Sequence, residues 1–150
     1  MNVETDSNFR PLEERERKLL ERLLDHHPFE GRDQLRRQLD STTARLIDEY
    51  KDNYGSIELR VADATPAKVP CLVPVEAEYF DDDGVPVWVL LHVNRAGVMQ
   101  ELEICRADGL ALMSHPVPEL LEPFSKDYAA LIQEAKANSE RRPKGAQEQN

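Results

Sequence analysis

Residues 81–105, DDDGVPVWVLLHVNRAGVMQELEIC, contain two turns and two strand-like segments, and this stretch decides the fold. The turn DDDG precedes alternating residues from 85 to 93, and the turn NRAG precedes a second alternating segment from 98 to 105. Aspartate, asparagine and glycine favour tight hairpin turns, and a period of two is typical of a half-buried strand. A similar segment at 69–80 comes directly before the first turn. The sequence therefore predicts three neighbouring antiparallel strands, which form a β-meander.

Helical periodicity predicts two further elements on the N-terminal side, over residues 11–27 and 32–50. Alternation at 56–61 predicts another strand, and apolar residues at helical spacing predict a helix over 124–138. The expected fold class is α+β, with two N-terminal helices packed on a four-stranded antiparallel meander sheet, plus a C-terminal helix. The expected organisation is a flexible leader at 1–9, a single α+β domain at 10–138 and a disordered tail at 139–150.

Strand parity assigns the two faces of this sheet. One face collects the aliphatic side chains that the helices should cover, namely Ile57, Leu59, Val61, Val73, Val75, Val87, Val89, Leu91, Leu102 and Ile104. The opposite face collects carboxylates around one tryptophan, and its candidate partner-binding residues are Glu76, Glu78, Trp88, His92, Glu101 and Glu103. Aromatic side chains surrounded by charge are common at protein-binding sites. The alternative is a solvated face on which Trp88 packs against its neighbours, since antiparallel sheets often expose one face to water.

The net charge restricts the class of partner. The chain of 150 residues carries a formal charge of −10, from 29 acidic and 19 basic side chains. Nucleic-acid binding depends on basic groups that neutralise phosphates, so this charge argues against nucleic acid and anionic membranes and favours a basic protein. No apolar run is long enough to span a bilayer, and the first nine residues are unlike a signal peptide. A cytoplasmic location is therefore expected.

Motifs for chemistry are weak throughout the sequence. It contains no glycine-rich phosphate loop and no Gly-x-Ser-x-Gly elbow. His92 with Glu101 or Glu103 across a hairpin could hold a cation weakly, but nothing has zinc-ligand spacing. Cys71 and Cys105 are expected to be reduced core residues. The sequence thus predicts no catalytic residue, no metal site and no cofactor.

Several short segments carry a family resemblance. Arg10-Pro11-Leu12 precedes the leucine-rich helix, Tyr54-Gly55-Ser56 opens the first strand, and DDGVPV at 82–87 continues through LHVN at 91–94 and Gly97 to ELEI at 101–104. In this order, over about residues 9–124, the segments resemble the DUF6984 family of uncharacterised bacterial proteins. The resemblance implies a bacterial origin and a compact α+β fold. It implies no activity, because the family has no assigned activity or catalytic residues.

Three functional hypotheses follow from these observations. The first is a non-enzymatic binding module that presents the acidic face around Trp88 to a basic protein, for instance a bacterial immunity protein that neutralises a basic toxin. The second is a small-ligand-binding protein or enzyme with its site at one end of the sheet, for which the candidate groups are His92, His115, Tyr54 and Glu76. The third is a structural or oligomerising module that uses the strand at 69–80 as an exposed edge.

Overall fold

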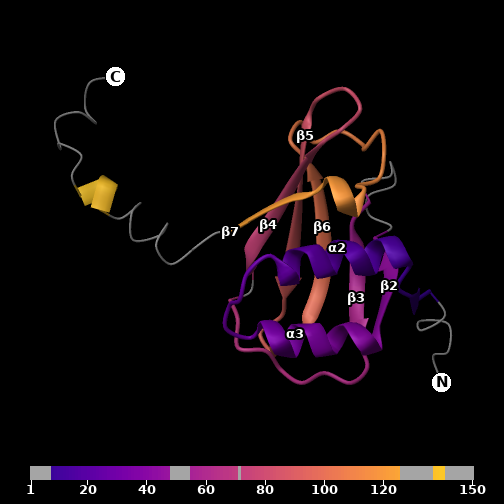
Figure 1. Cartoon of the computed structure of the whole chain (residues 1–150), viewed down its shortest axis with the longest axis vertical. Helices are drawn as coiled ribbons and strands as arrows, with labels where there is room; N and C mark the ends of the chain where they lie inside the picture. Colours follow the sequence, from indigo (N-terminus) through magenta and orange to yellow (C-terminus); the bar gives the residue numbers. More distant parts are fainter. Residues whose placement is uncertain (1–7, 48–54, 71, 126–136, 141–150) are drawn as a thin grey trace.

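The computed structural model describes residues 8–47, 55–70, 72–125 and 137–140. Two helices cover one face of a seven-stranded antiparallel sheet, so the α+β class is confirmed (Figure 1). The elements in chain order are β1 (Arg10–Pro11), α2 (Glu14–Asp25), α3 (Arg32–Gln38), the 3-10 helix η1 (Leu39–Ser41), β2 (Thr42–Leu46), β3 (Ile57–Val61), β4 (Leu72–Phe80), β5 (Pro86–Val93), β6 (Met99–Arg106), the 3-10 helix η2 (Pro118–Leu120) and β7 (Glu122–Ser125). The strand order across the sheet is β1-β2-β3-β6-β5-β4-β7, which is three strands wider than the expected four.

The meander of β4, β5 and β6 is confirmed, and both predicted turns close it. In the first turn, the backbone amide of Asp81 donates to the carbonyl oxygen of Val85 at 2.9 Å. In the second turn, the amide of Gly97 donates to the carbonyl oxygen of Asn94 at 2.9 Å. Gly97 has φ +79°, in the left-handed region that glycine adopts without steric cost.

The remaining expected strand, β3, pairs with β6 and not with β4, the strand that follows it in sequence. The connection from β3 to β4 therefore has to pass the end of the β5–β6 hairpin. Ala67 in this connection donates its amide to the carbonyl oxygen of Gly97 at 2.8 Å. A side chain at Gly97 would place its Cβ 2.2 Å from the carbonyl oxygen of Ala67. This close backbone approach fixes the crossing segment against the turn.

The prediction of one helix over 32–50 is wrong beyond Gln38, where α3 ends. The chain makes a 3-10 turn and then enters β2, which pairs with β3. Two consecutive β-branched residues, Thr42 and Thr43, favour extended backbone over helix. Leu46, which fits the helical spacing, is 48% exposed in β2. The final residues of the predicted helix lie outside the described part of the chain.

The prediction of a C-terminal helix over 124–138 is wrong at its start, because Phe124 lies in β7 and pairs with Glu76 of β4. Pro123 cannot donate to a strand ladder, but a proline is tolerated on an edge strand such as β7. Strand β4 is therefore covered on both sides and is not the exposed edge that the oligomerisation hypothesis needs. Residues 126–136 lie outside the described ranges, and residues 137–140 are helical.

The two helices pack their leucines on one side of the sheet. Leu19, Leu20, Leu23 and Leu24 of α2 are at most 1% exposed, and Leu35 of α3 is fully buried. The aliphatic sheet residues assigned to the core by parity are buried as predicted, except that Val61 is only partly buried. The sidedness of the sheet is therefore confirmed. Among the described residues, no helix has the length and apolar character required to cross a membrane.

Candidate functional site

The six candidate binding residues all lie on the sheet face that points away from α2 and α3. Glu76 and Glu78 belong to β4, Trp88 and His92 to β5, and Glu101 and Glu103 to β6. We call this surface the acidic face. It is formed by the three strands of the meander, on which the side chains of alternate parity, such as Ala77, Val89 and Leu102, point into the core. Five of the six residues are half-buried, whereas Glu76 is 7% exposed.

Trp88 and Glu78 form a direct cross-strand pair on the acidic face. The indole Nε1–H of Trp88 donates to Oε2 of Glu78 at 2.9 Å. A tryptophan that keeps its ring on an apolar surface usually satisfies its single N–H donor in this way. The hydrogen bond holds the indole in one orientation against the sheet.

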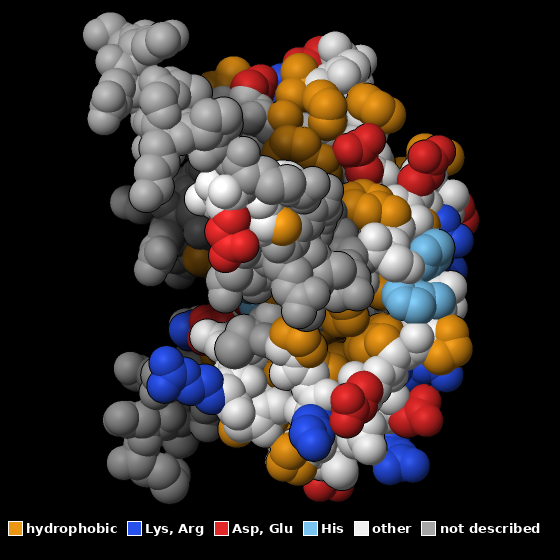
Figure 2. Space-filling model, turned by 90° about the vertical axis from the view of Figure 1, so that its left-hand side faces the viewer, with side chains coloured by type: hydrophobic (Ala, Val, Ile, Leu, Met, Phe, Trp, Pro, Cys, Tyr) orange, Lys and Arg blue, Asp and Glu red, His pale blue; other side chains and the backbone are white. Residues whose placement is uncertain are grey.

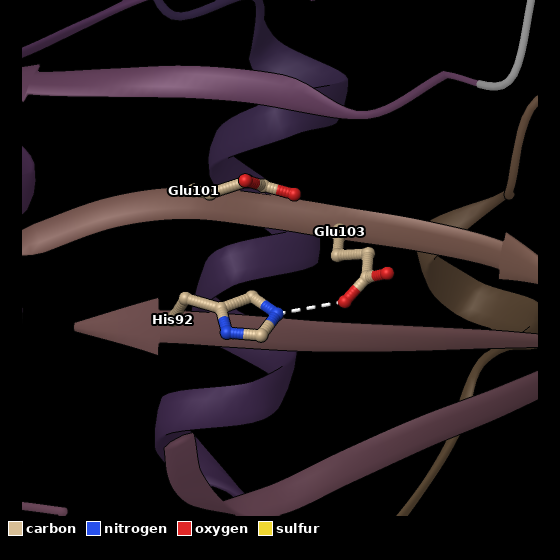
Figure 3. A group of neighbouring side chains, drawn as sticks. All are labelled: His92, Glu101 and Glu103. Carbon is tan, nitrogen blue, oxygen red and sulfur yellow. Dashed lines mark hydrogen bonds and ion pairs between the residues drawn. The ribbon is translucent and has the colours of Figure 1, made fainter. Parts of the chain in front are cut away.

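His92 and Glu103 form a second pair, across the β5–β6 hairpin. Nε2 of His92 lies 2.7 Å from Oε1 of Glu103. Glu101 is the direct cross-strand partner of His92, and one ligand atom of each of the three residues lies within 4.8 Å of the other two. Figure 3 shows the imidazole and both carboxylates on the same side of the two strands.

A groove of about 420 Å³ opens on the acidic face. The described residues that line it are Glu76, Trp88, Leu90, Glu103, Cys105 and Phe124. A second hollow, of about 620 Å³, lies at the end of the β5–β6 hairpin and is lined in part by His92 and Glu101. The lining of the groove therefore combines apolar and aromatic side chains with two carboxylates.

Two of the groove residues, Cys105 and Phe124, were not expected on this surface. Cys105 is half-buried and lies on the acidic face, so the prediction that it belongs to the core is wrong. Its position follows from parity, because it comes two positions after Glu103 on the same strand. Burial, with a smaller contribution from the charge of Glu103, raises the pKa of this thiol. Cys71 lies outside the described residues.

The groups of the small-ligand hypothesis do not converge at one point among the described residues. Glu76 lines the groove and His92 lines the hollow at the hairpin end. His115 is exposed on the segment after β6 and is near Gly55. Tyr54 lies outside the described residues.

A second polar cluster, which the sequence analysis missed, lies at the other end of the meander. The guanidinium of Arg106 donates to Asp81 at 2.7 Å, to Asp83 at 2.5 Å and to Asp108 at 2.8 Å. Asp81 also accepts the amide of Met113 at 2.8 Å. Parity gave the signal for this cluster, because it places Arg106 on the core side of β6, where a charge needs partners.

Asp81 is held as a carboxylate by these contacts. Burial acts to raise its pKa, but hydrogen bonds from the Met113 amide and from Arg106 outweigh burial and lower the pKa to about 2. The side chain of Asp81 is fully buried and that of Arg106 is 5% exposed. All of these groups are satisfied within the chain, so the cluster joins segments of the fold and we assign it no ligand.

Hydrophobic side chains are exposed close to this cluster, where the β4–β5 turn meets the segment after β6. Figure 2 shows orange side chains gathered at this upper end of the molecule. Phe80 at the end of β4 and four residues of the segment after β6, namely Leu110, Met113, Val117 and Leu120, are 46% to 68% exposed.

Comparison with known proteins gives one match. The model of a family described as "Domain of unknown function (DUF6984)" matches residues 9–116. The matched range includes β1 to β6 and both helices, and therefore all six candidate residues of the acidic face. No curated protein and no solved structure matches the chain.

Proposed function

Because the chain belongs to the DUF6984 family, whose function is unknown, we propose its function from the geometry: it is a non-enzymatic module that binds a basic protein through the acidic face. The observation that carries this proposal is the placement of four glutamates and the single tryptophan on one side of the β4–β5–β6 meander, around an open groove.

The groove supplies the apolar part of such a contact. Trp88 and Leu90 are half-buried neighbours on the same face, and Phe124 of β7 lies beside them in the lining. Aromatic side chains that are fixed before binding contribute strongly to protein interfaces, because little side-chain entropy is lost when the partner docks. The hydrogen bond from Trp88 to Glu78 fixes the indole in this manner.

The carboxylates supply charge complementarity. Glu76, Glu78, Glu101 and Glu103 lie on the same face as Trp88, in a chain of net charge −10. A negatively charged surface accelerates association with a positively charged partner and disfavours negatively charged partners. The concrete form that we favour is an immunity protein that neutralises a basic toxin by covering its surface.

A capture experiment tests this proposal. The full chain is immobilised and offered the products of the genes adjacent to its own, purified one at a time, at low and at high salt. We expect one basic protein to bind, with affinity that falls as salt rises because surface charges are screened. In the variant Trp88→Ala with Glu78→Lys, binding should fall at least about tenfold, as expected for loss of a central aromatic contact worth more than about 1.4 kcal/mol.

The matched control is Glu14→Lys, which reverses one charge on α2 at a side chain that is 84% exposed. This variant should bind the partner as the unaltered chain does. The proposal fails if none of these proteins binds, or if the acidic-face variant and the control bind equally.

A further inference from the structure

We infer that His92, Glu101 and Glu103 form a binding site for one divalent transition-metal ion, and that Zn²⁺ suits it best. The inference goes beyond the proposed function, since it needs no protein partner. The three residues come from the paired strands β5 and β6, with His92 opposite Glu101 and with Glu103 two positions further on the same side.

The geometry is close to that of a metal site. Nε2 of His92 is 2.7 Å from Oε1 of Glu103, and the ligand atoms of all three residues lie within 4.8 Å of one another. Zinc bonds of about 2.0–2.2 Å to nitrogen and oxygen require neighbouring ligand atoms to lie roughly 3–3.5 Å apart. Small side-chain rotations of the glutamates are therefore enough to bring the three groups around one ion.

Strand pairing fixes the relative positions of His92, Glu101 and Glu103. The β5–β6 ladder is regular from Val87 to His92, and the register shifts only after His92. The three Cα positions are thus set by strand pairing and not by a loop. Sites built on strands hold their ligands more exactly in place than sites built on loops.

The local charge favours a cation. Glu58 of β3 is the direct cross-strand partner of Glu101, so two carboxylates face each other beside Glu103. Like charges directly opposite on a sheet destabilise it. Arg45 pairs with Glu58 at 2.7 Å and partly offsets this repulsion. A dication bound by Glu101 and Glu103 would add an attraction to both carboxylates.

The site is also accessible. Glu103 lines the groove, whereas His92 and Glu101 line the hollow at the hairpin end, so the three residues lie between the two openings. All three side chains are half-buried. Three protein ligands leave at least one position for water or for a group from another molecule, as in zinc sites that exchange ligands.

The ligand set indicates which ion fits. One imidazole nitrogen and two carboxylates suit borderline ions such as Zn²⁺, whereas Mg²⁺ and Ca²⁺ prefer oxygen ligands only. We therefore expect Zn²⁺ to bind much more tightly than Mg²⁺.

Titration calorimetry with Zn²⁺ alone tests the inference, on the full chain without an affinity tag. We expect one ion per chain, and at least about tenfold weaker binding in Glu103→Gln and in His92→Gln, since even outer-shell substitutions at metal sites cost 10–100-fold. The matched control replaces His26 and His27 by Gln, because these adjacent histidines are another place at which zinc could bind. Binding in this control should be unchanged.

A second measurement observes the histidine ligand directly. Proton NMR of the unaltered chain should show Zn²⁺ shifting the ring signals of one histidine out of four, and His92→Gln should remove that signal. The inference is overturned if no saturable binding of one ion occurs, or if the His26/His27 control loses binding while Glu103→Gln keeps it. Trp88→Ala with Glu78→Lys leaves the three ligands intact, so it should bind Zn²⁺ normally whether or not a protein partner exists.

Discussion

The guanidinium Nη1 of Arg106 lies 2.7 Å from Oδ2 of Asp81, and the two side chains are 5% and 0% exposed. This ion pair joins the end of β6 to the β4–β5 turn. Asp81 also accepts the amides of Met113 and Ser114, so three segments meet at one carboxylate.

Replacing Asp81 by Ala should destabilise the protein by roughly 3–5 kcal/mol. The substitution removes the acceptor of the buried Arg106 guanidinium and of the backbone amides of Met113 and Ser114. The measurement is urea denaturation followed by circular dichroism. Asp82→Ala, which alters an exposed residue of the same turn, is the control and should cost less than about 1 kcal/mol. Equal losses in the two variants would contradict the role given to Asp81.

Lowering the pH should decrease the stability of the fold through the carboxylates that surround Arg106. The pKa of Asp81 is lowered from 3.8 to about 2 in the folded protein. The hydrogen bonds from Arg106 also lower the pKa values of Asp83 and Asp108. A depressed folded-state pKa stabilises the fold above the unfolded pKa, and this stabilisation is lost as the pH falls through the folded value.

The free energy of unfolding should therefore decrease between about pH 5 and pH 2. In Asp81→Asn the decrease over this window should be shallower, because one of the contributing carboxylates is absent. Unfolding curves at closely spaced pH values give the slope for both proteins, and identical slopes would argue against Asp81 as a contributor.

Gln38 should be sensitive to substitution although it carries no charge. Its buried amide donates to the carbonyl oxygens of Thr65 and Gly97, each at 2.9 Å, and accepts the amide of Met99 at 2.9 Å. Gln38→Leu leaves these backbone groups unsatisfied and should cost about 1–3 kcal/mol. Gln100→Leu, at an exposed position of β6, is the comparison and should change the unfolding free energy by less than about 0.5 kcal/mol.

Gly97 and Gly84 provide a test of the close approach at Ala67. Both have positive φ, +79° and +84°. A Cβ added at Gly97 would lie within 3 Å of backbone atoms of Ala67, whereas a Cβ added at Gly84 would have no atom within 4 Å. Gly84→Ala should cost about 1–2 kcal/mol for the left-handed conformation alone. Gly97→Ala should cost clearly more, because the backbone must move. Thermal unfolding of the two variants side by side decides whether the contact matters.

Cys105 should react slowly with alkylating reagents. Burial, and then the neighbouring charge of Glu103, raises its pKa, and the thiolate is the reactive form. Glu103→Gln should therefore increase the rate of iodoacetamide labelling at this residue, read by mass spectrometry of the Cys105 peptide. A rate that is unchanged, or lower, would show that the charge of Glu103 does not control this thiol.

The parts of the fold that follow from local signals were predictable from the sequence. The turns at Asp81 and Asn94 and the period of two in β5 and β6 specify the meander, and the same parity correctly separates the core from the acidic face. The same parity also places Cys105 with Glu101 and Glu103 on the outer side of β6.

The errors arose where long-range pairing outweighed local periodicity. Leucines at 35, 39 and 46 fit a helix, yet β3 offers the segment at Thr42 a strand partner, and pairing within a sheet decides its structure. Phe124 likewise fits a helical stripe but extends the sheet beside β4. The convergence of His92 with the glutamates followed from the hairpin, because the turn at Asn94 places Glu101 and Glu103 of β6 across from His92 of β5.

Trp88 is the only tryptophan in the chain, and its indole is bonded to Glu78 at the groove. The emission of tryptophan, excited where tyrosine does not absorb, therefore comes from the acidic face alone. A molecule that docks in the groove would change the wavelength or intensity of this emission, whereas one that settles on the helices would leave it as it is. The protein thus carries its own optical reporter for the one surface on which its proposed activity depends.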